Sequence, residues 1–282
     1  MVRNEADIIE AFVRHNLSRL DGLLIIDHRS DDRTRDILAA LAREGLPLAL
    51  TLDDDPAQRQ PENITRLARE AFAQGADCVV PLDADEFLKV RDRAAFERTL
   101  SSLPSDLCAA LEWQTYVPEE HADAAHPLAA ARRRRAAEAH GLYKVVLTRA
   151  FARTPAAVVG PGNHTVLMMG AQQDVTRTQV RLARLPAATA ALAHFPVRSI
   201  AQLVRKIEVG WAAHCAAARS DPTLAFHWRE LHEEIAMRGP PTPQRLRTIA
   251  VNYGLPMARW QPAAAVPMVE DPLPVGSALR YG

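Results

Sequence analysis

Short apolar runs alternate with amphipathic helical segments through the first third of the chain. Residues 8–20 carry apolar side chains at helical spacing, and the run LLIID at 23–27 has the length of a buried strand. The order then continues through a helical segment at 33–44, a strand-like run at 46–52, a helical segment at 61–74 and the run DCVVPLD at 77–83. Continuously apolar strands separated by helices are typical of a parallel sheet covered on both faces, so the pattern predicts an α/β fold.

Two acidic clusters stand where strands of this pattern end. Asp27–Asp32 follows the run at 23–27, and Asp83–Glu86 follows the run at 77–83. Sheets of this kind bind their ligands just beyond the carboxyl ends of the strands. We therefore expect Asp27 and Asp83 to lie in one cleft at that edge.

The bulk composition excludes several classes of protein. The chain has 282 residues, of which 48% are hydrophobic, enough to bury the core of one large α/β domain or two small ones. Its 34 basic residues are balanced by 34 acidic ones, so we expect no nucleic-acid partner. No window approaches the roughly 20 uninterrupted apolar residues of a spanning helix, so membrane contact would have to be peripheral.

The cysteines and the first residues bear on the compartment. Cys78, Cys108 and Cys215 are far apart and form no CxxC pair, which suits a reducing environment. The opening MVRNEADIIE has acidic residues where a signal peptide needs a basic start followed by an apolar run. Together these features predict a cytoplasmic protein.

Asp83 and Asp85 form a carboxylate pair. They are separated by one residue after an apolar run, so in an extended backbone both side chains project to the same side. Paired carboxylates are ligands suited to Mg²⁺ or Mn²⁺, and no histidine or cysteine stands close enough to argue for zinc. The spacing alone also allows a solvated acidic loop that caps a neighbouring helix.

The combination of motifs resembles the family 2 glycosyltransferases of the GT-A fold, in particular a bacterial branch that opens with VRNE and reaches DADEF. The matching elements are Val2–Glu5, Ile26–Asp32 and Leu82–Phe87. The resemblance covers roughly the first 90 residues and continues more loosely to about Ile207, through HFPVRSIAQLVRKI. It implies a GT-A-like, mostly parallel sheet flanked by helices, here followed by a helical C-terminal region.

The resemblance also implies roles for particular residues. The donor would be a UDP-, GDP- or TDP-sugar, and the nucleotide-sugar contacts would come from Arg3, Asn4, Glu5, Asp27 and Asp83. Asp83 would lie near the ribose and the metal, and Asp85 would bind the metal directly. A Mn²⁺ or Mg²⁺ ion would assist departure of the nucleoside diphosphate. The sugar would pass to a polysaccharide, a lipid-linked glycan or another acceptor.

In similar enzymes a downstream histidine is often the third metal ligand. We favour His194, because a strand-like run ends there and a helix opens near Ser199. Lys206 falls within the next turns, where its cation could meet phosphate oxygens, and we count it among the nucleotide-sugar contacts. His164 is the alternative ligand. The catalytic base stays open among four acids: Glu86, Glu112, Glu119 and Glu120.

We expect three regions along the chain: a nucleotide-sugar-binding catalytic domain at 1–198, a helical C-terminal region at 199–260 and an irregular tail at 261–282. Within the first, we expect residues 118–140 to form a loop. In the family that the chain resembles, VRNE ends a first β-strand. Only Met1 precedes it here, so that strand would be very short or would lack residues.

Two other functions compete with sugar transfer. One is a non-catalytic nucleotide-sugar-binding module that has kept the fold. The other is a metal-dependent phosphohydrolase or nucleotidyltransferase, since carboxylates at strand ends serve those reactions too. The second fits less well, because the chain has no phosphate loop of the GxxxxGK type.

Overall fold

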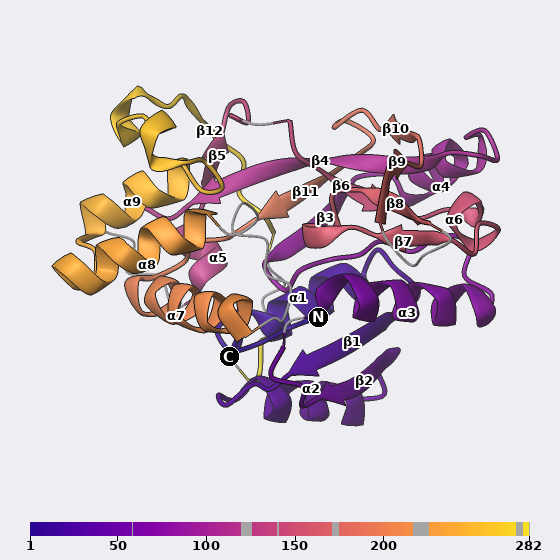
Figure 1. Ribbon diagram of the computed structural model, residues 1–282, viewed down its shortest axis with the longest axis horizontal. Coiled ribbons are helices and arrows are strands. Elements are labelled where there is room, and N and C mark those ends of the chain that lie inside the picture. Colours follow the sequence, from indigo (N-terminus) through magenta and orange to yellow (C-terminus); the bar gives the residue numbers. More distant parts are fainter. Residues whose placement is uncertain are drawn as a thin grey trace.

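Helices flank several sheets in the computed structural model, which describes residues 1–57, 59–119, 126–139, 141–170, 175–216, 226–274 and 279–281. Figure 1 shows a small sheet of β1 (Leu23–His28) and β2 (Leu48–Asp53) set apart from a larger sheet above it. β1 and β2 are parallel, and Leu23 lies opposite Leu48. The helices α1 (Ile9–Leu17), α2 (Thr34–Arg43) and α3 (Gln60–Ala73) belong to this N-terminal part.

The larger sheet is organised around the long strand β4 (Cys108–Val117). β4 pairs in parallel with β11 (Ala190–His194) and β10 (Leu182–Arg184). It pairs antiparallel with β5 (Arg133–Arg135) and β6 (Tyr143–Val146). At the edges, β3 (Glu86–Val90) is antiparallel to β11, and β12 (Met268–Glu270) is antiparallel to β5. A third, antiparallel sheet contains β7 (Ala157–Val159), β8 (Val166–Met169) and β9 (Val175–Gln179).

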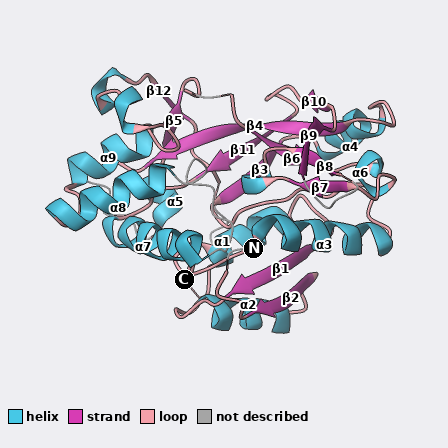
Figure 2. Cartoon of the chain, in the orientation of Figure 1, coloured by secondary structure: helices cyan, strands magenta, loops and turns pink. Residues whose placement is uncertain are grey.

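The C-terminal region is helical. Figure 2 shows α7 (Ile200–Ala216), α8 (Phe226–Arg238) and α9 (Pro243–Val251) gathered on one side of the molecule. They share a hydrophobic cluster with Val117 at the end of β4. The shorter helices α4 (Arg93–Ser101), α5 (Pro127–Ala130) and α6 (Arg149–Ala152) lie in the connections between strands. The expected α/β fold with flanking helices and a helical C-terminal region is confirmed.

Two local expectations were wrong. The run 77–83 was expected to be a strand ending at Asp83, but its described pairing is a single bridge between Val79 and Leu147, and β3 begins only at Glu86. Pro81 has no N–H to donate, and a turn follows in which Glu86 N–H donates to the Asp83 carbonyl at 3.0 Å.

The second concerns residues 118–140, expected to be a loop. They contain α5 and β5, because the arginine run pairs with β4 and β12 on its two edges. Residues 120–125 and 140 lie outside the described residues.

Val2 is the part of the expected first strand that pairs with β1. It lies opposite Asp27 in a parallel bridge, where its N–H donates to the Ile26 carbonyl and its carbonyl accepts from the His28 N–H, both at 2.8 Å. This bridge fixes where the following residues, Arg3 to Glu5, leave the sheet. None of the described helices has the length and apolar character needed to cross a membrane.

Asn16 ties α1 to β3. Its side chain is fully buried, its Nδ2 donates to the Glu86 carbonyl at 3.2 Å, and its Oδ1 accepts from the Leu88 N–H at 2.9 Å. The same Nδ2 also donates to the carbonyl of Phe12. One amide therefore holds the start of β3 against the helix that covers it.

We predict that Asn16→Ala lowers the free energy of unfolding by about 2–4 kcal/mol, because it removes these hydrogen bonds from a dry site. Urea denaturation followed by circular dichroism measures this. The exposed Gln74→Ala variant serves as the control and should stay within about 0.5 kcal/mol of wild type. Equal effects of the two substitutions would contradict the role assigned to Asn16.

Candidate functional site

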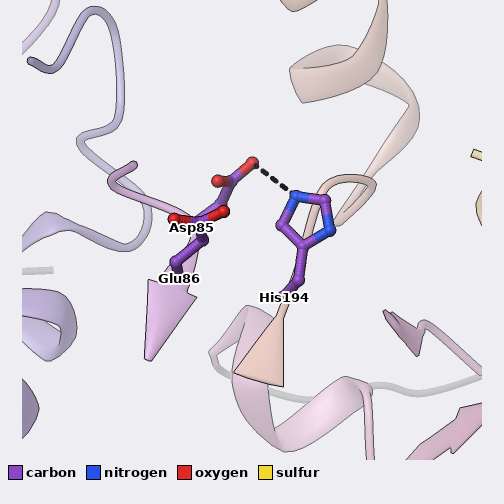
Figure 3. A group of neighbouring side chains, drawn as sticks. All are labelled: Asp85, Glu86 and His194. Carbon is purple, nitrogen blue, oxygen red and sulfur yellow. Dashed lines mark ion pairs between the residues drawn. The ribbon is translucent and has the colours of Figure 1, made fainter. Parts of the chain in front are cut away.

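Asp85, Glu86 and His194 form a buried group of potential metal ligands. One ligand atom from each lies within 4.8 Å of the others, an arrangement found once among the residues that the structure describes. Glu86 at the start of β3 is the register partner of His194 at the end of β11, and Asp85 lies in the preceding turn. Figure 3 shows the Asp85 carboxylate directed toward the imidazole, with 3.7 Å between Oδ2 and Nε2. The three side chains thus converge from two strand ends.

Two lysines neutralise the carboxylates of this region. Lys206 Nζ lies 2.6 Å from Asp85 Oδ2. Lys144 Nζ lies 2.6 Å from Asp83 Oδ2 and 2.8 Å from Glu86 Oε1, and its side chain is only 1% exposed. Buried charges are stable only when paired, so these contacts explain how the chain keeps so many acids out of water. A cation bound to the group would share its ligands with these ammonium groups.

The adjacent carboxyl groups of Asp85 and Glu86 differ in charge. Burial opposes ionisation of Asp85, but the nearby charges of Lys206 and His194 outweigh it and lower its pKa. For Glu86, burial dominates over the attraction of Lys144 and raises the pKa to about 8. Near neutral pH, Asp85 is therefore ionised while Glu86 retains its proton.

Arg198 joins the VRNE segment to the histidine strand. Its guanidinium is 1% exposed, with Nη2 2.5 Å from Glu5 Oε2 and Nε 2.8 Å from Asp7 Oδ2. It also donates to the Phe195 carbonyl at 3.2 Å, next to His194. Burial raises the pKa of Glu5 to about 7, against the opposing effect of Arg198. The N-terminal loop is thereby held beside the Asp85 group.

The carboxyl end of β1 and the adjacent N-terminal segment have buried polar side-chain atoms without a hydrogen-bond partner in the protein. Asp27 is fully buried and its Oδ1 accepts from the Ser30 N–H at 3.1 Å and from Arg35 Nε at 2.5 Å, whereas its Oδ2 has no hydrogen bond. Nδ2 of Asn4 and Nε of Arg3 are likewise buried without a hydrogen-bond partner. Such atoms are rare in folded proteins and point to a ligand that completes their hydrogen bonds.

The backbone of the same loops is held in an unusual conformation. Asn4 has φ of 58° and Arg29 has φ of 57°, in the left-handed region that non-glycine residues seldom adopt. Asn4 is fixed there because its N–H donates to Ser30 Oγ and its Oδ1 accepts from the Asp31 N–H, both at 2.9 Å. Strained residues held by their surroundings gather at binding sites.

The expected residues separate into two sets. Asp85, His194 and Lys206 lie together, as do Arg3, Asn4 and Asp27. Asp83 is not part of the three-ligand group, and accepts instead from Lys144 and from Gln60 Nε2 at 2.9 Å. Its role as a metal ligand stays a prediction.

Trp113 separates the two candidate histidines. His194 stacks on its indole with 3.9 Å between ring centroids, and His164 meets it edge-on at 5.4 Å. His164 Nδ1 lies 2.9 Å from the carbonyl oxygen of Tyr143. The structure thus brings His194, and not His164, into the group with Asp85.

Two contributors were not anticipated in these positions. From the sequence, Glu86 is a candidate base or a group that supports the metal loop, and no motif singles out Lys144. A lysine inside the buried run YKVV was the available signal, because an enclosed ammonium group requires an acidic partner. Of the other acids, Glu112 is partly buried, Glu119 is exposed and Glu120 lies outside the described residues.

No protein-family profile and no curated protein matches the chain. Among solved structures it is similar to the mannosyltransferase PcManGT from Pyrobaculum calidifontis in complex with GDP-Man and Mn²⁺. The two chains are 17% identical, and the alignment covers 94% of this chain and 76% of that chain with a TM-score of 0.38. So slight a likeness carries no conclusion about substrate, which must come from the residues of the site.

We predict that the stability difference between wild type and Glu86→Gln depends on pH. Between the ordinary Glu pKa of 4.5 and about 8, the folded protein holds a proton at Glu86 that the unfolded chain has released. Wild type therefore loses stability at this residue as pH rises through the window, by on the order of 3 kcal/mol, while glutamine does not titrate. Urea denaturation of both proteins from pH 5 to 8, with chelator present, measures the difference. A constant difference would contradict the assignment.

Proposed function

We propose that this protein is a metal-dependent glycosyltransferase, similar to family 2, that transfers a sugar from a nucleotide-diphosphate sugar to a glycan or lipid-linked acceptor. The observation that carries the proposal is the buried group of Asp85, Glu86 and His194, together with the unpartnered polar atoms of Arg3, Asn4 and Asp27. The group of Asp85, Glu86 and His194 has the chemistry of a cation site, and the unpartnered atoms of Arg3, Asn4 and Asp27 have that of a nucleoside site. The VRNE segment lies next to both: Val2 pairs with β1 at Asp27, and Glu5 binds Arg198, which donates to the Phe195 carbonyl next to His194.

The donor set fits a divalent metal. Carboxylate oxygens and one imidazole nitrogen are ligands that Mn²⁺ accepts, whereas Mg²⁺ prefers oxygen ligands alone. Asp85 and His194 would hold the ion, with Glu86 next to them and Asp83 two residues before Asp85. When bound, the ion would supply positive charge to offset the diphosphate as it leaves the sugar. The lowered pKa of Asp85 keeps this ligand ionised for that purpose.

Arg3 and Asn4 of the N-terminal segment, together with Asp27 near the end of β1, would bind the nucleoside. Asp27 Oδ2 can accept a hydrogen bond from a ribose hydroxyl or a base N–H, and Asn4 Nδ2 can donate to a base carbonyl. Lys206, which reaches Asp85 from α7, is placed to exchange that contact for a phosphate oxygen. These residues would orient the donor, while Glu5 and Arg198 hold the loop in place.

One alternative has an observation in its favour. Lys144 and Lys206 already neutralise the carboxylates, as would suit a module that binds a nucleotide sugar without a metal and without turnover. Such a module would bind donors equally well in chelator. The proposed enzyme would not.

We predict metal-dependent release of nucleoside diphosphate from at least one member of a panel of UDP-, GDP- and TDP-sugars. Release should appear with Mn²⁺ and stop on chelation. Asp85→Asn should lower it by at least about 100-fold, because the substitution removes the charged ligand. Binding without release in every condition would favour the module, and release of inorganic phosphate would favour a phosphohydrolase.

Matched variants keep this test specific. Asp106→Asn makes the same chemical change on a side chain that is 67% exposed and should leave release unchanged. His194→Gln should weaken Mn²⁺ binding, measured by calorimetry, whereas His164→Gln should not. If His164→Gln weakened Mn²⁺ binding and His194→Gln did not, the ligand role would pass to His164.

We further predict that Asp27→Asn weakens binding of the matching nucleoside diphosphate by about tenfold or more, since a hydrogen bond to a charged acceptor is lost. Calorimetric titration in chelator isolates this effect from the metal. The exposed Asp36→Asn variant is the control. Unchanged affinity in Asp27→Asn would remove Asp27 from the nucleoside site.

A further inference from the structure

A cavity of about 390 Å³ lies between the end of β5 and the chain that follows α9. This volume falls within the range of about 300–1,000 Å³ that small-molecule sites occupy. Two of the residues that line it are arginines and none is acidic: Arg135, Ala139, Asn252, Leu255, Arg259 and Gln261. The lining therefore favours an anion over a neutral or cationic occupant.

Arg135 places a buried charge at this cavity without a carboxylate to neutralise it. Only two arginines are buried in the described part of the chain, and the other, Arg198, is paired with two carboxylates. Arg135 donates instead to main-chain carbonyls, from Nε to Ala137 at 3.1 Å and from Nη1 to Val251. Burial lowers its pKa, and the charge of Glu138 only partly opposes that effect. Buried charges are normally paired, so an anion from outside the chain would complete this site.

The hydrogen bonds of Arg135 leave one of its nitrogens for a ligand. Nε and Nη1 are fixed by the carbonyls, while Nη2 makes no hydrogen bond to any residue that the structure describes. Arg259, at the end of the short helix η2 (Met257–Arg259), is exposed and lines the same cavity. Guanidinium groups bind phosphate and carboxylate oxygens through several N–H groups at once. Two of them at one cavity can share a single anion.

The loop that carries Arg259 is held closed by Asn252. The Asn252 side chain is 1% exposed, its Nδ2 donates to the Gln261 carbonyl at 2.8 Å, and its Oδ1 accepts from the Gln261 N–H at 2.9 Å. Within the loop, Trp260 Nε1 donates to the Leu255 carbonyl at 2.9 Å. The cavity is therefore formed before a ligand enters, and binding does not have to order this part of the chain.

The cavity adjoins the candidate metal group along two stretches of chain. On one, Tyr253 follows a residue of the lining, and its ring centroid lies 5.8 Å from that of His194. On the other, Glu138 precedes a residue of the lining, and its carboxylate accepts from the N–H of Thr115 at 2.7 Å. Thr115 is the register partner of His194. A molecule whose anion is held in the cavity can therefore reach the metal group with another part.

We propose that this cavity holds a phosphate or carboxylate group of the acceptor, so that the acceptor is a negatively charged sugar or glycan. The assignment rests on the proposed sugar transfer, in which the nucleoside lies at the carboxyl end of β1. Figure 1 shows β1 and β5 well apart, with β11 between them. The donor and an anion held at β5 would thus approach the metal group from different sides.

Binding of inorganic phosphate tests the cavity without any donor. Calorimetric titration at constant ionic strength, with chelator present, would compare wild type with Arg259→Gln and Arg238→Gln. Arg238 is exposed at the end of α8 and does not line the cavity, and its substitution makes the same change of charge. We expect Arg259→Gln to weaken phosphate binding by about tenfold or more, because charge-assisted hydrogen bonds are lost, and Arg238→Gln to leave it unchanged. No binding by wild type, or equal effects of the two substitutions, would overturn the proposal.

The acceptor role is tested by release of nucleoside diphosphate, with Mn²⁺, from a donor that wild type turns over. Glucose 6-phosphate, glucuronate and glucose would be added as a phosphorylated, a carboxylated and a neutral sugar. We expect one or both anionic sugars to raise release by about tenfold over glucose in wild type but not in Arg259→Gln, and the sugar that does so distinguishes phosphate from carboxylate. Equal effects of all three sugars, or no effect of any, would overturn the acceptor assignment. If no donor is turned over, the acceptor role falls with the sugar transfer, whereas phosphate binding that depends on Arg259 would still support the anion site.

Discussion

The antiparallel pairing of β3 with β11 is the constraint on which the candidate site depends. It sets Glu86 directly opposite His194, and the turn before β3 then brings Asp85 to the same imidazole. Side chains alternate along a strand, so a slip of one residue would turn His194 to the other face of the sheet. β4, which pairs with β11 through Thr115, and Asn16, which binds β3, hold this register from both sides.

Charge pairing explains how an acidic site survives at this depth. Glu86 is fully buried and Asp85 nearly so, and each would be costly to bury alone. Lys144 and Lys206 offset that cost, and the proton retained by Glu86 removes one charge altogether. The same contacts hold the two carboxylates in position. A cation that enters the group would compete with Lys144 and Lys206 for their oxygens.

The N-terminal segment couples the two halves of the site. Val2 pairs with β1 next to Asp27, Asn4 is locked in a left-handed conformation, and Glu5 is held by Arg198. The position of Arg3 and Asn4 relative to the Asp85 group thus depends on the path of a few residues.

The sequence by itself determined the α/β class, because hydrophobic periodicity reports local burial. The resemblance to a known family favoured His194 as the partner of Asp85 and left His164 as the alternative. Tertiary structure alone decided that His194 and not His164 lies beside Asp85, that Glu86 completes this group, and that Asp83 lies outside it and pairs with Lys144. An extended backbone across DAD would project both aspartates to one side, but the turn at residues 84 and 85 redirects the carboxylates. Which side chains then meet depends on strand register between segments about a hundred residues apart, and local patterns do not contain that information.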